Sequence, residues 1–253
     1  MKLKDKVAII TGAGSGIGRA TVQKFIEEGA SIVACDINPN ALETLASEQP
    51  EIETSCGDVC SRSDTERIVQ TAVERFGRLD ILVNSAGITA RNVDSEADFE
   101  ARWDAVMQVN TKGTMLMSHA AVEVMRSNGS GAIINIGSIM GLVGYSKSLP
   151  FSDGFNPYPA SKGAVAQLTR DMGVRLAGEG IRINAVCPGF VYTALTENVT
   201  GNPEVHETMR NLHPMGRMGQ AEEIANVVSF LASDEASFVA AAIWPVDGGY
   251  TAV

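Results

Sequence analysis

A tyrosine and a lysine, Tyr158 and Lys162, stand four positions apart in the segment Tyr-Pro-Ala-Ser-Lys. On a helix these two positions share one face. An ammonium group beside a phenol favours the phenolate and lowers the tyrosine pKa from its reference value of about 10. A tyrosine of this kind can act as general acid or base on an alcohol or carbonyl oxygen. The alternative is a tyrosine at a helix start with a solvated lysine.

Two prolines, Pro157 and Pro159, flank the tyrosine, and Asn156 precedes them. Proline is tolerated in the first turn of a helix, where the amides lack partners within the helix. Asparagine is a favoured N-cap. We therefore expect a helix to begin at Pro157, which places Tyr158 at its start and facing a cleft.

Two further polar side chains are candidates for the same chemistry. Ser138 ends an apolar run, and its hydroxyl could hold the substrate oxygen beside Tyr158. Alternatively, it is one of many small residues in a glycine-rich turn. Asn110 lies between two helical segments, where its amide could hold a water and begin a proton relay through Lys162. A simple helix cap is the alternative for Asn110.

A glycine-rich turn spans Thr11 to Gly18 in the sequence TGAGSGIG, between an apolar run and a helical pattern. Glycine permits a tight turn and a close approach of backbone to phosphate. The first amides and the dipole of the following helix favour the phosphate charge. This context is the one that a dinucleotide-binding motif requires, although a plain glycine-rich turn is the alternative. The predicted cofactor contacts here are Gly12, Ser15, Gly16, Ile17 and Gly18.

An aspartate, Asp36, ends the second apolar run, 18 positions after Gly18. An acidic side chain at about this position accepts hydrogen bonds from the adenosine ribose hydroxyls, and it would repel a 2′-phosphate. Ile37, which is also a predicted cofactor contact, and Asn38 follow it instead of a basic residue. NAD is therefore favoured over NADP, although Arg19 could approach a phosphate. A turn-forming aspartate is the alternative.

The ends of the third and fourth apolar runs carry further candidates. Asp58 could bind the adenine amino group, with Val59 beside it, or it could cap a turn. The segment Asn84-Ser85-Ala86-Gly87 would let the backbone pass close to a ligand. We therefore predict cofactor contacts from Asn84, Ala86 and Gly87; a generic strand-to-loop turn is the alternative.

Short β-branched runs alternate with longer segments of helical periodicity. The predicted strands are Val7–Thr11, Ser31–Asp36, Ile52–Cys56, Leu79–Asn84, Ala132–Gly137, Ile181–Cys187 and Ala242–Val246. The clearest helical segments are Ile17–Glu28, Arg62–Phe76 and Ala221–Ala232. Nearly continuous apolar strands are typical of a parallel sheet that helices cover on both faces. Without a repeat, a linker or a break in composition, we predict one doubly wound α/β domain over residues 1–253, with ligands at the carboxyl ends of its strands.

The composition excludes several classes of protein. Of the 253 residues, 45% are hydrophobic and 20% charged, as in ordinary globular chains. The net charge of −10 argues against binding to nucleic acids or to anionic membranes. The four cysteines and three histidines show no disulfide framework and no metal-ligand spacing. With no signal peptide or membrane span in the sequence, we expect a cytoplasmic protein that acts on a small molecule.

Seven sequence features come in an order that resembles the short-chain dehydrogenase/reductase family. They are TGAGSGIG, Asp58, NSAG at 84–87, Asn110, Ser138, YPASK at 158–162 and PG at 188–189. The resemblance runs from Lys6 to the Asp-Gly-Gly segment at 247–249. It implies a seven-stranded parallel Rossmann-type sheet, commonly in a homotetramer.

The same resemblance implies roles for individual residues. Asn110, Ser138, Tyr158 and Lys162 match the catalytic tetrad of the family. The cofactor contacts would also include Tyr158 and Lys162 and, after the predicted strand Ile181–Cys187, Pro188, Gly189, Val191 and Thr193. Thr193 matches the residue that contacts the nicotinamide carboxamide. The implied reaction is reversible hydride transfer between NAD(H) and a secondary alcohol or ketone.

Two segments, at about 139–157 and 190–218, are expected to border the substrate. Ser138 and Tyr158 are 20 positions apart, which is longer than is usual in the family, and the surplus falls within 144–156. The apolar candidates in these segments line the pocket or pack the loops down; they are Tyr145, Leu149, Phe151, Phe155, Leu195, Met209, Leu212 and Met215.

These side chains favour an apolar, cyclic or aromatic substrate. One alternative is an NADPH-dependent reductase of 3-oxoacyl thioesters on a carrier protein. Another is a regulatory protein that binds the cofactor without turnover.

Overall fold

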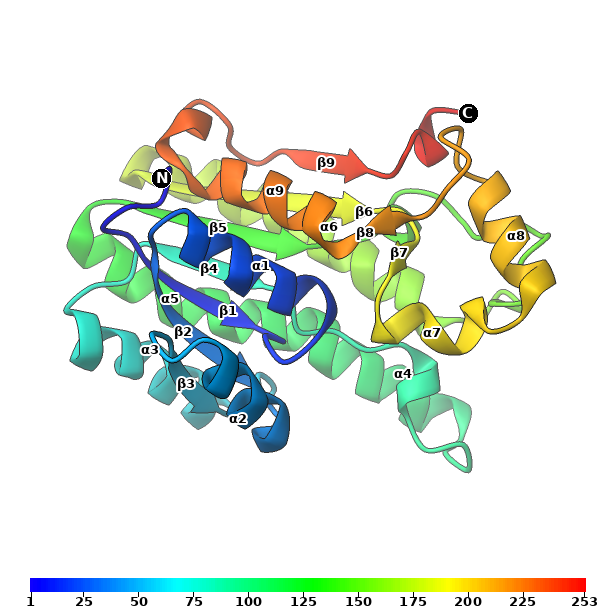
Figure 1. The fold of residues 1–253 in the computed structure, drawn as a ribbon, viewed down its shortest axis with the longest axis horizontal. Helices are drawn as coiled ribbons and strands as arrows, with labels where there is room; N and C mark the ends of the chain where they lie inside the picture. Colours follow the sequence, from blue (N-terminus) through cyan, green and yellow to red (C-terminus); the bar gives the residue numbers. More distant parts are fainter.

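A seven-stranded parallel sheet forms the centre of the computed structural model (Figure 1), which describes residues 1–253 apart from the side chains of residues 198 and 199. The strand order is β3-β2-β1-β4-β5-β6-β9. The strands are β1 (Val7–Thr11), β2 (Ser31–Asp36), β3 (Glu53–Cys56), β4 (Ile81–Asn84), β5 (Gly131–Ile136), β6 (Ile181–Pro188) and β9 (Ile243–Val246). The order reverses between β1 and β4, which is the switch point of a doubly wound sheet. The predicted fold class is therefore confirmed, with strand boundaries shifted by one or two residues.

Helices cover both faces of the sheet, so that a hydrophobic core lies on each face. Successive residues of a strand point alternately into these two cores. In β1, Ala8 and Ile10 pack with α1 (Gly16–Glu27), α2 (Pro39–Glu48) and α9 (Ala221–Ala232). Val7 and Ile9 face the opposite core, which contains side chains of α3 (Arg62–Phe76), α5 (Thr114–Asn128) and α6 (Pro157–Leu176). Because successive strand residues point to opposite faces, a strand covered on both sides must be apolar throughout.

Local sequence signals set the ends of the helices that carry the site. The Asn156 side chain accepts a hydrogen bond from the Tyr158 amide at 2.9 Å, so α6 begins at Pro157 as predicted. The Ser61 hydroxyl caps α3, which ends at Gly77 with a φ of 79°. Between α4 (Phe99–Met107) and α5 the chain forms a wider π-helical turn, η2 (Gln108–Gly113).

A smaller layer lies beyond the carboxyl edge of the sheet. Two short strands, β7 (Val191–Tyr192) and β8 (Gly219–Gln220), pair in parallel and enclose α7 (Ala194–Thr200) and α8 (Pro203–Asn211) in the sequence. Figure 1 shows these helices beyond the arrowheads of the central strands. The remaining short helices are η1 (Ala90–Asn92), η3 (Ile139–Gly141), η4 (Ala177–Glu179), η5 (Asp234–Ala236) and η6 (Tyr250–Ala252). Among the helices described, none is both long enough and apolar enough to cross a membrane.

Candidate active site

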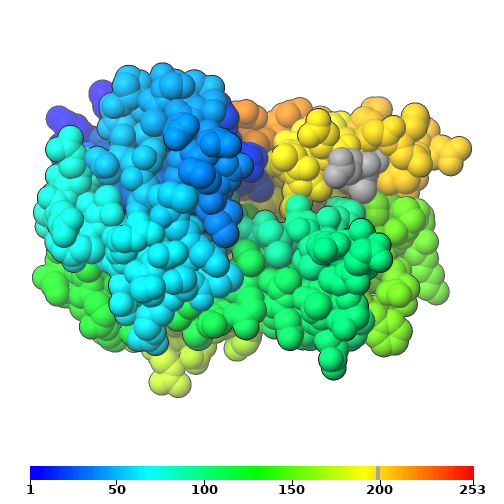
Figure 2. Space-filling model, turned by 90° about the horizontal axis from the view of Figure 1, so that it is seen from below, coloured from blue at the N-terminus to red at the C-terminus, as the bar shows by residue number. Residues whose placement is uncertain are grey.

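A cavity of about 470 Å³ lies at the carboxyl edge of the sheet, where the loops after the strands meet. Figure 2 shows the yellow segment around α7 beside the green segment around α4, next to the blue N-terminal segments. Nearly all of the predicted cofactor and catalytic residues line this cavity, including Pro188, Gly189, Val191 and Thr193. The predicted residues that lie behind its wall are Gly18, Asn84 and Asn110.

The first turn of α1 faces this cavity without a side-chain cap. Ser15 accepts no hydrogen bond from the turn through its side chain, and the turn holds no acidic residue. By contrast, Asn38 caps α2 and Ser61 caps α3. Gly16 and Ile17 in this first turn line the cavity. The uncapped amides and the positive end of the helix therefore fit the pyrophosphate of a dinucleotide.

The glycines of this turn serve two different purposes. Gly12 has a φ of +64°, and a Cβ there would lie 2.9 Å from the backbone nitrogen of Ala86, so the loops after β1 and β4 touch only because Gly12 lacks a side chain. A Cβ at Gly18 would lie 2.1 Å from the carbonyl oxygen of Gly12. Gly18 therefore packs α1 against the turn and does not line the cavity, and its contact with the cofactor stays a prediction.

Asp36 lies at the cavity with its carboxylate fixed by backbone amides. It accepts hydrogen bonds from the Gly14 amide and the Asn38 amide, both at 2.9 Å. Asp36 thus lines the cavity. Its bond from the Asn38 amide also makes it a turn-forming aspartate, the alternative role considered in the sequence analysis. Ile37 beside it is 67% exposed, and Arg19 is ion-paired with Glu48.

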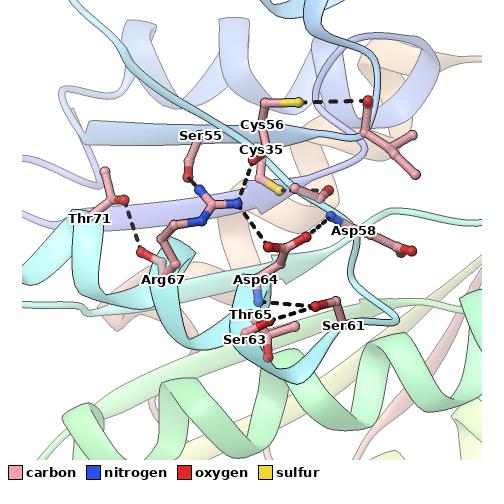
Figure 3. A network of polar contacts seen from close by, with 12 residues as sticks. Cys35, Ser55, Cys56, Asp58, Ser61, Ser63, Asp64, Thr65, Arg67 and Thr71 are labelled. Carbon is pink, nitrogen blue, oxygen red and sulfur yellow. Dashed lines mark hydrogen bonds and ion pairs between the residues drawn. The ribbon is translucent and has the colours of Figure 1, made fainter.

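The loop that carries Asp58 and Val59 is held by a polar network (Figure 3). Asp64 accepts a hydrogen bond from the Asp58 amide at 2.9 Å, and Arg67 binds Asp64 at 3.2 Å and the Cys56 carbonyl at 2.7 Å. The Asp58 carboxylate accepts a bond from the Cys60 amide at 2.8 Å, so Asp58 also caps a turn. Asp64 and Arg67 were not predicted from the sequence. The signal for Asp64 was an acidic residue three positions after the N-cap Ser61.

The Asn84 side chain is directed into the core, and the contact of this residue with the cofactor stays a prediction. Its amide donates to the Ser118 hydroxyl at 3.0 Å and to the Asn135 side chain at 2.9 Å. Asn135 in turn donates to the Thr169 hydroxyl at 2.9 Å. This buried network joins β4 and β5 to α5 and α6, although the Asn84 Oδ1 atom itself has no hydrogen-bond partner among the described residues. Ala86 and Gly87, two and three residues later, do line the cavity.

Ser138, Tyr158 and Lys162 converge in the cavity from the end of β5 and the first turns of α6. The Lys162 Nζ donates to the Ile136 carbonyl at 2.8 Å and lies 5.7 Å from the centre of the Tyr158 ring. Burial lowers the pKa of Lys162 to about 8. Burial also raises the pKa of Tyr158, and contact with the Ser138 hydroxyl opposes this effect. The expectation that Lys162 lowers the Tyr158 pKa is therefore wrong for this structure, in which burial dominates.

Asn110 lies inside the π-helical turn and positions the loop after β4. Its side chain accepts from the Ile88 amide at 2.8 Å and donates to the Ile88 carbonyl and the Ser161 hydroxyl, each at 2.9 Å. It therefore does not act as the helix cap that the sequence offered as an alternative. The side-chain oxygen of Asn110 would lie 3.3 Å from a Cβ on Gly87. Because Gly87 lines the cavity, Asn110 lies directly behind the cavity wall.

The additional residues before Tyr158 form an aromatic wall. Tyr145 and Phe151 line the cavity, and their ring centres are 5.8 Å apart. Leu149 is buried with Met209 and Met218, whereas Phe155 is 70% exposed. Of the predicted lining residues in this segment, Tyr145 and Phe151 are confirmed, Leu149 packs the loop down, and Phe155 is outside the cavity.

The 190–218 segment forms the opposite wall. Leu195 and Met209 line the cavity as predicted. Leu212 packs behind it in the apolar clusters, and Met215 is exposed. Phe190 also lines the cavity, with its ring centre 6.2 Å from that of Phe151. The two predicted substrate segments therefore meet at this aromatic pair.

The short helix η1 supplies lining residues that sequence analysis missed. Thr89, Arg91 and Asn92 all line the cavity. The Asn92 side chain accepts from the Thr89 amide at 2.8 Å and from its hydroxyl at 3.0 Å. This reciprocal cap fixes the backbone on both sides of Arg91. The spacing of Thr89 and Asn92 was the available signal, because it matches a capping box with asparagine in the last position.

Known proteins resemble this chain over nearly its full length. A family model described as enoyl-(acyl carrier protein) reductase matches residues 12–251. A 3-oxoacyl-[acyl-carrier-protein] reductase of Thermotoga maritima is 39% identical, covering 98% of this chain and 99% of the relative. A cis-4-hydroxycyclohexanecarboxylate dehydrogenase of Sinomonas cyclohexanicum is also 39% identical, covering 98% of both chains.

The fold is likewise shared with solved structures. A crystal structure of levodione reductase aligns with a TM-score of 0.89 and 36% identity, covering 99% of each chain. Together with the ordered motifs and the strand order, these matches establish the family. The chain belongs to the short-chain dehydrogenase/reductase family.

Proposed function

We propose that this chain is an oxidoreductase that interconverts a secondary alcohol and a ketone with a nicotinamide cofactor. The observation that carries the proposal is the convergence of Ser138, Tyr158 and Lys162 in the same cavity as the uncapped start of α1. The cofactor, when bound, supplies or accepts the hydride. The residues of the chain bind it, orient the substrate and move the proton.

In alcohol oxidation Tyr158 accepts the hydroxyl proton, and in ketone reduction it donates this proton to the carbonyl oxygen. Ser138 holds the reacting oxygen through its hydroxyl, which lies beside the phenol. Lys162 is fixed by the Ile136 carbonyl and places its charge beneath the ring of Tyr158. Asn110 positions the loop that carries Gly87, next to Lys162.

NAD is the proposed cofactor in preference to NADP. The Asp36 carboxylate lines the cavity, where it can accept hydrogen bonds from ribose hydroxyls and would repel a 2′-phosphate. Arg19, the nearest candidate cation in the sequence, is paired with Glu48. Thr193, which lies beside Gly16 and lines the cavity, would hold the nicotinamide carboxamide.

The proposed substrate is cyclic or aromatic, with an apolar ring that carries the reacting alcohol or ketone. Tyr145, Phe151 and Phe190 supply a largely apolar wall, which suits a ring. The relative named for cis-4-hydroxycyclohexanecarboxylate supports a cyclic secondary alcohol. The relative named for 3-oxoacyl carrier-protein thioesters represents the second candidate function. That second function would use NADPH, whose binding Asp36 disfavours. The net charge of −10 also disfavours binding of an acidic carrier protein.

A homotetramer in the cytoplasm completes the proposal, by family resemblance. Val174 on α6 is 73% exposed and Phe238 is fully exposed, as expected of side chains that a second copy covers. Light scattering with size-exclusion chromatography tests the assembly, and a monomeric mass would contradict it.

The test of the activity is incubation of the protein with NAD or NADP and a panel of cyclic and acyclic secondary alcohols. We expect reduction of NAD with the cyclic members and none with Tyr158→Phe. Turnover of a 3-oxoacyl thioester with NADPH, in the absence of alcohol oxidation, would favour the second candidate. Binding of the cofactor without turnover of any compound would indicate a regulatory protein.

A further inference from the structure

The two ends of the cavity differ in charge. Among the described residues that line it, the charged side chains are Asp36, Asp58, Arg91 and Lys162. The two aspartates belong to the adenosine end, after β2 and β3. Lys162 is buried and committed to the Ile136 carbonyl. Arg91 is therefore the cation that the substrate end can present to a ligand.

Arg91 is an exposed residue whose backbone and guanidinium both make contacts. Its amide donates to the Thr89 hydroxyl at 3.3 Å within the capped turn of η1. Its guanidinium carbon lies 5.4 Å from the centre of the Phe151 ring, and one guanidinium nitrogen lies 3.5 Å from the Leu195 carbonyl. Stacking on an aromatic face orients a guanidinium while leaving its edge free to donate hydrogen bonds.

No carboxylate among the described residues forms an ion pair with Arg91. No carboxylate of the described residues therefore neutralises the Arg91 charge at the cavity. The positive charge of Arg91 also acts on Tyr158. It lowers the Tyr158 pKa and so opposes the increase that burial causes. It acts in the same sense on the pKa of Tyr145, on the same wall.

We infer that Arg91 binds a carboxylate of the substrate, so that the substrate is a cyclic secondary alcohol or ketone that also carries a carboxylate. This inference rests on the proposed function, and it adds the second recognised group. The hydroxyl lies at Ser138 and Tyr158, the ring packs between the aromatic wall and Leu195, and the carboxylate accepts hydrogen bonds from the guanidinium. The planar guanidinium matches a carboxylate in a bidentate pair, which a neutral ester or amide cannot reproduce.

Binding alone tests the carboxylate site without turnover. Cyclohexanecarboxylate and cyclohexanecarboxamide would be titrated calorimetrically into the protein, with and without NADH. We expect the carboxylate to bind about 10- to 100-fold more tightly than the amide, as for a charge-assisted hydrogen-bonded pair. Arg91→Gln should abolish this preference, and Arg91→Lys should keep part of it. A preference that is absent from the wild-type protein, or that persists in Arg91→Gln, would overturn the inference.

A matched control removes the same charge elsewhere. Arg62 is exposed at the start of α3 and does not line the cavity, so Arg62→Gln should retain the full preference. If Arg62→Gln loses it as Arg91→Gln does, net charge and not a site explains the binding, and the inference fails.

Turnover then separates this inference from the proposed function. The protein would be assayed with NAD and 4-hydroxycyclohexanecarboxylate, its methyl ester and cyclohexanol. We expect the ratio of kcat/KM for the acid to that for the ester to fall about 10- to 100-fold in Arg91→Gln. Oxidation of the alcohols without preference for the acid would leave the proposed function intact and overturn the role of Arg91. A carboxylate preference in binding without oxidation of any alcohol would support the anion site and contradict the proposed function.

Discussion

The end of the cavity that we propose for adenosine (the adenosine end, after β1, β2 and β3) and the end that we propose for the substrate (the substrate end) are built in different ways. At the adenosine end, backbone conformation makes the site: Gly12 lets two loops touch, and the uncapped first turn of α1 presents amides. At the substrate end, side chains from distant segments make the site, as where Phe151 meets Phe190. A site made of backbone tolerates few substitutions, whereas a site made of loop side chains can change its ligand without changing the fold.

Tyr158 lies where the two ends meet, and its replacement should have the largest effect. Tyr158→Phe removes the group that exchanges the proton while keeping the ring that packs beside Ser138. We expect kcat for alcohol oxidation to fall about a thousandfold. Binding of NADH, followed by its fluorescence, should change less than about twofold, because the cofactor is held mainly at the adenosine end. A large loss of NADH affinity would show that the two ends are not separable in this way.

Gly18 tests how rigid the adenosine end is. A Cβ there would lie 2.1 Å from the Gly12 carbonyl oxygen, which is backbone and cannot rotate away. We expect Gly18→Ala to lower the free energy of unfolding by about 3 kcal/mol and to weaken NADH binding. Chemical denaturation with and without NADH measures both effects.

Gly178 provides the matched control for that substitution. A Cβ at Gly178 would have no neighbour within 4 Å. Gly178→Ala should therefore change the free energy of unfolding by less than about 0.5 kcal/mol. Equal losses in the two variants would mean that loss of glycine itself, and not the clash with the turn, is responsible.

The same difference explains what could be predicted from the sequence. Strands buried on both faces and glycines between a strand and a helix leave local patterns, so the fold and the residues from Gly12 to Gly16 followed directly from the residue types. The core position of the Asn84 side chain could not be predicted, because nothing local distinguishes an amide that lines a cavity from one that joins two strands to a helix. Arg91 was missed because its importance depends on Phe151 and Leu195, which are distant in the sequence. The Tyr158 pKa was misjudged because burial is a property of the whole fold.

Cofactor preference tests whether the adenosine end depends on charge as well as on backbone. In the double variant Asp36→Ala/Ile37→Arg, the carboxylate that would repel a 2′-phosphate is removed and a guanidinium that can bind it is introduced. We expect the ratio of kcat/KM with NAD to that with NADP to fall about 100-fold. The ratio between different alcohol substrates should stay the same. A change in alcohol preference would show that residue 36 acts beyond the adenosine end.

Phe151 gives the smallest effect and the most specific test of the substrate end. It lines the cavity, whereas Phe155 in the same segment is 70% exposed and outside it. Phe151→Ala should raise KM for a cyclic alcohol about tenfold, because it removes apolar contact with the ring and the face on which Arg91 rests. Phe155→Ala should leave KM within about twofold of wild type, and neither variant should alter the affinity for NADH. If the two substitutions raise KM equally, the segment acts by packing the loop as a whole. The substrate end would then not be built from individual side chains that contact the ligand, and the difference between the two ends of the cavity would not hold.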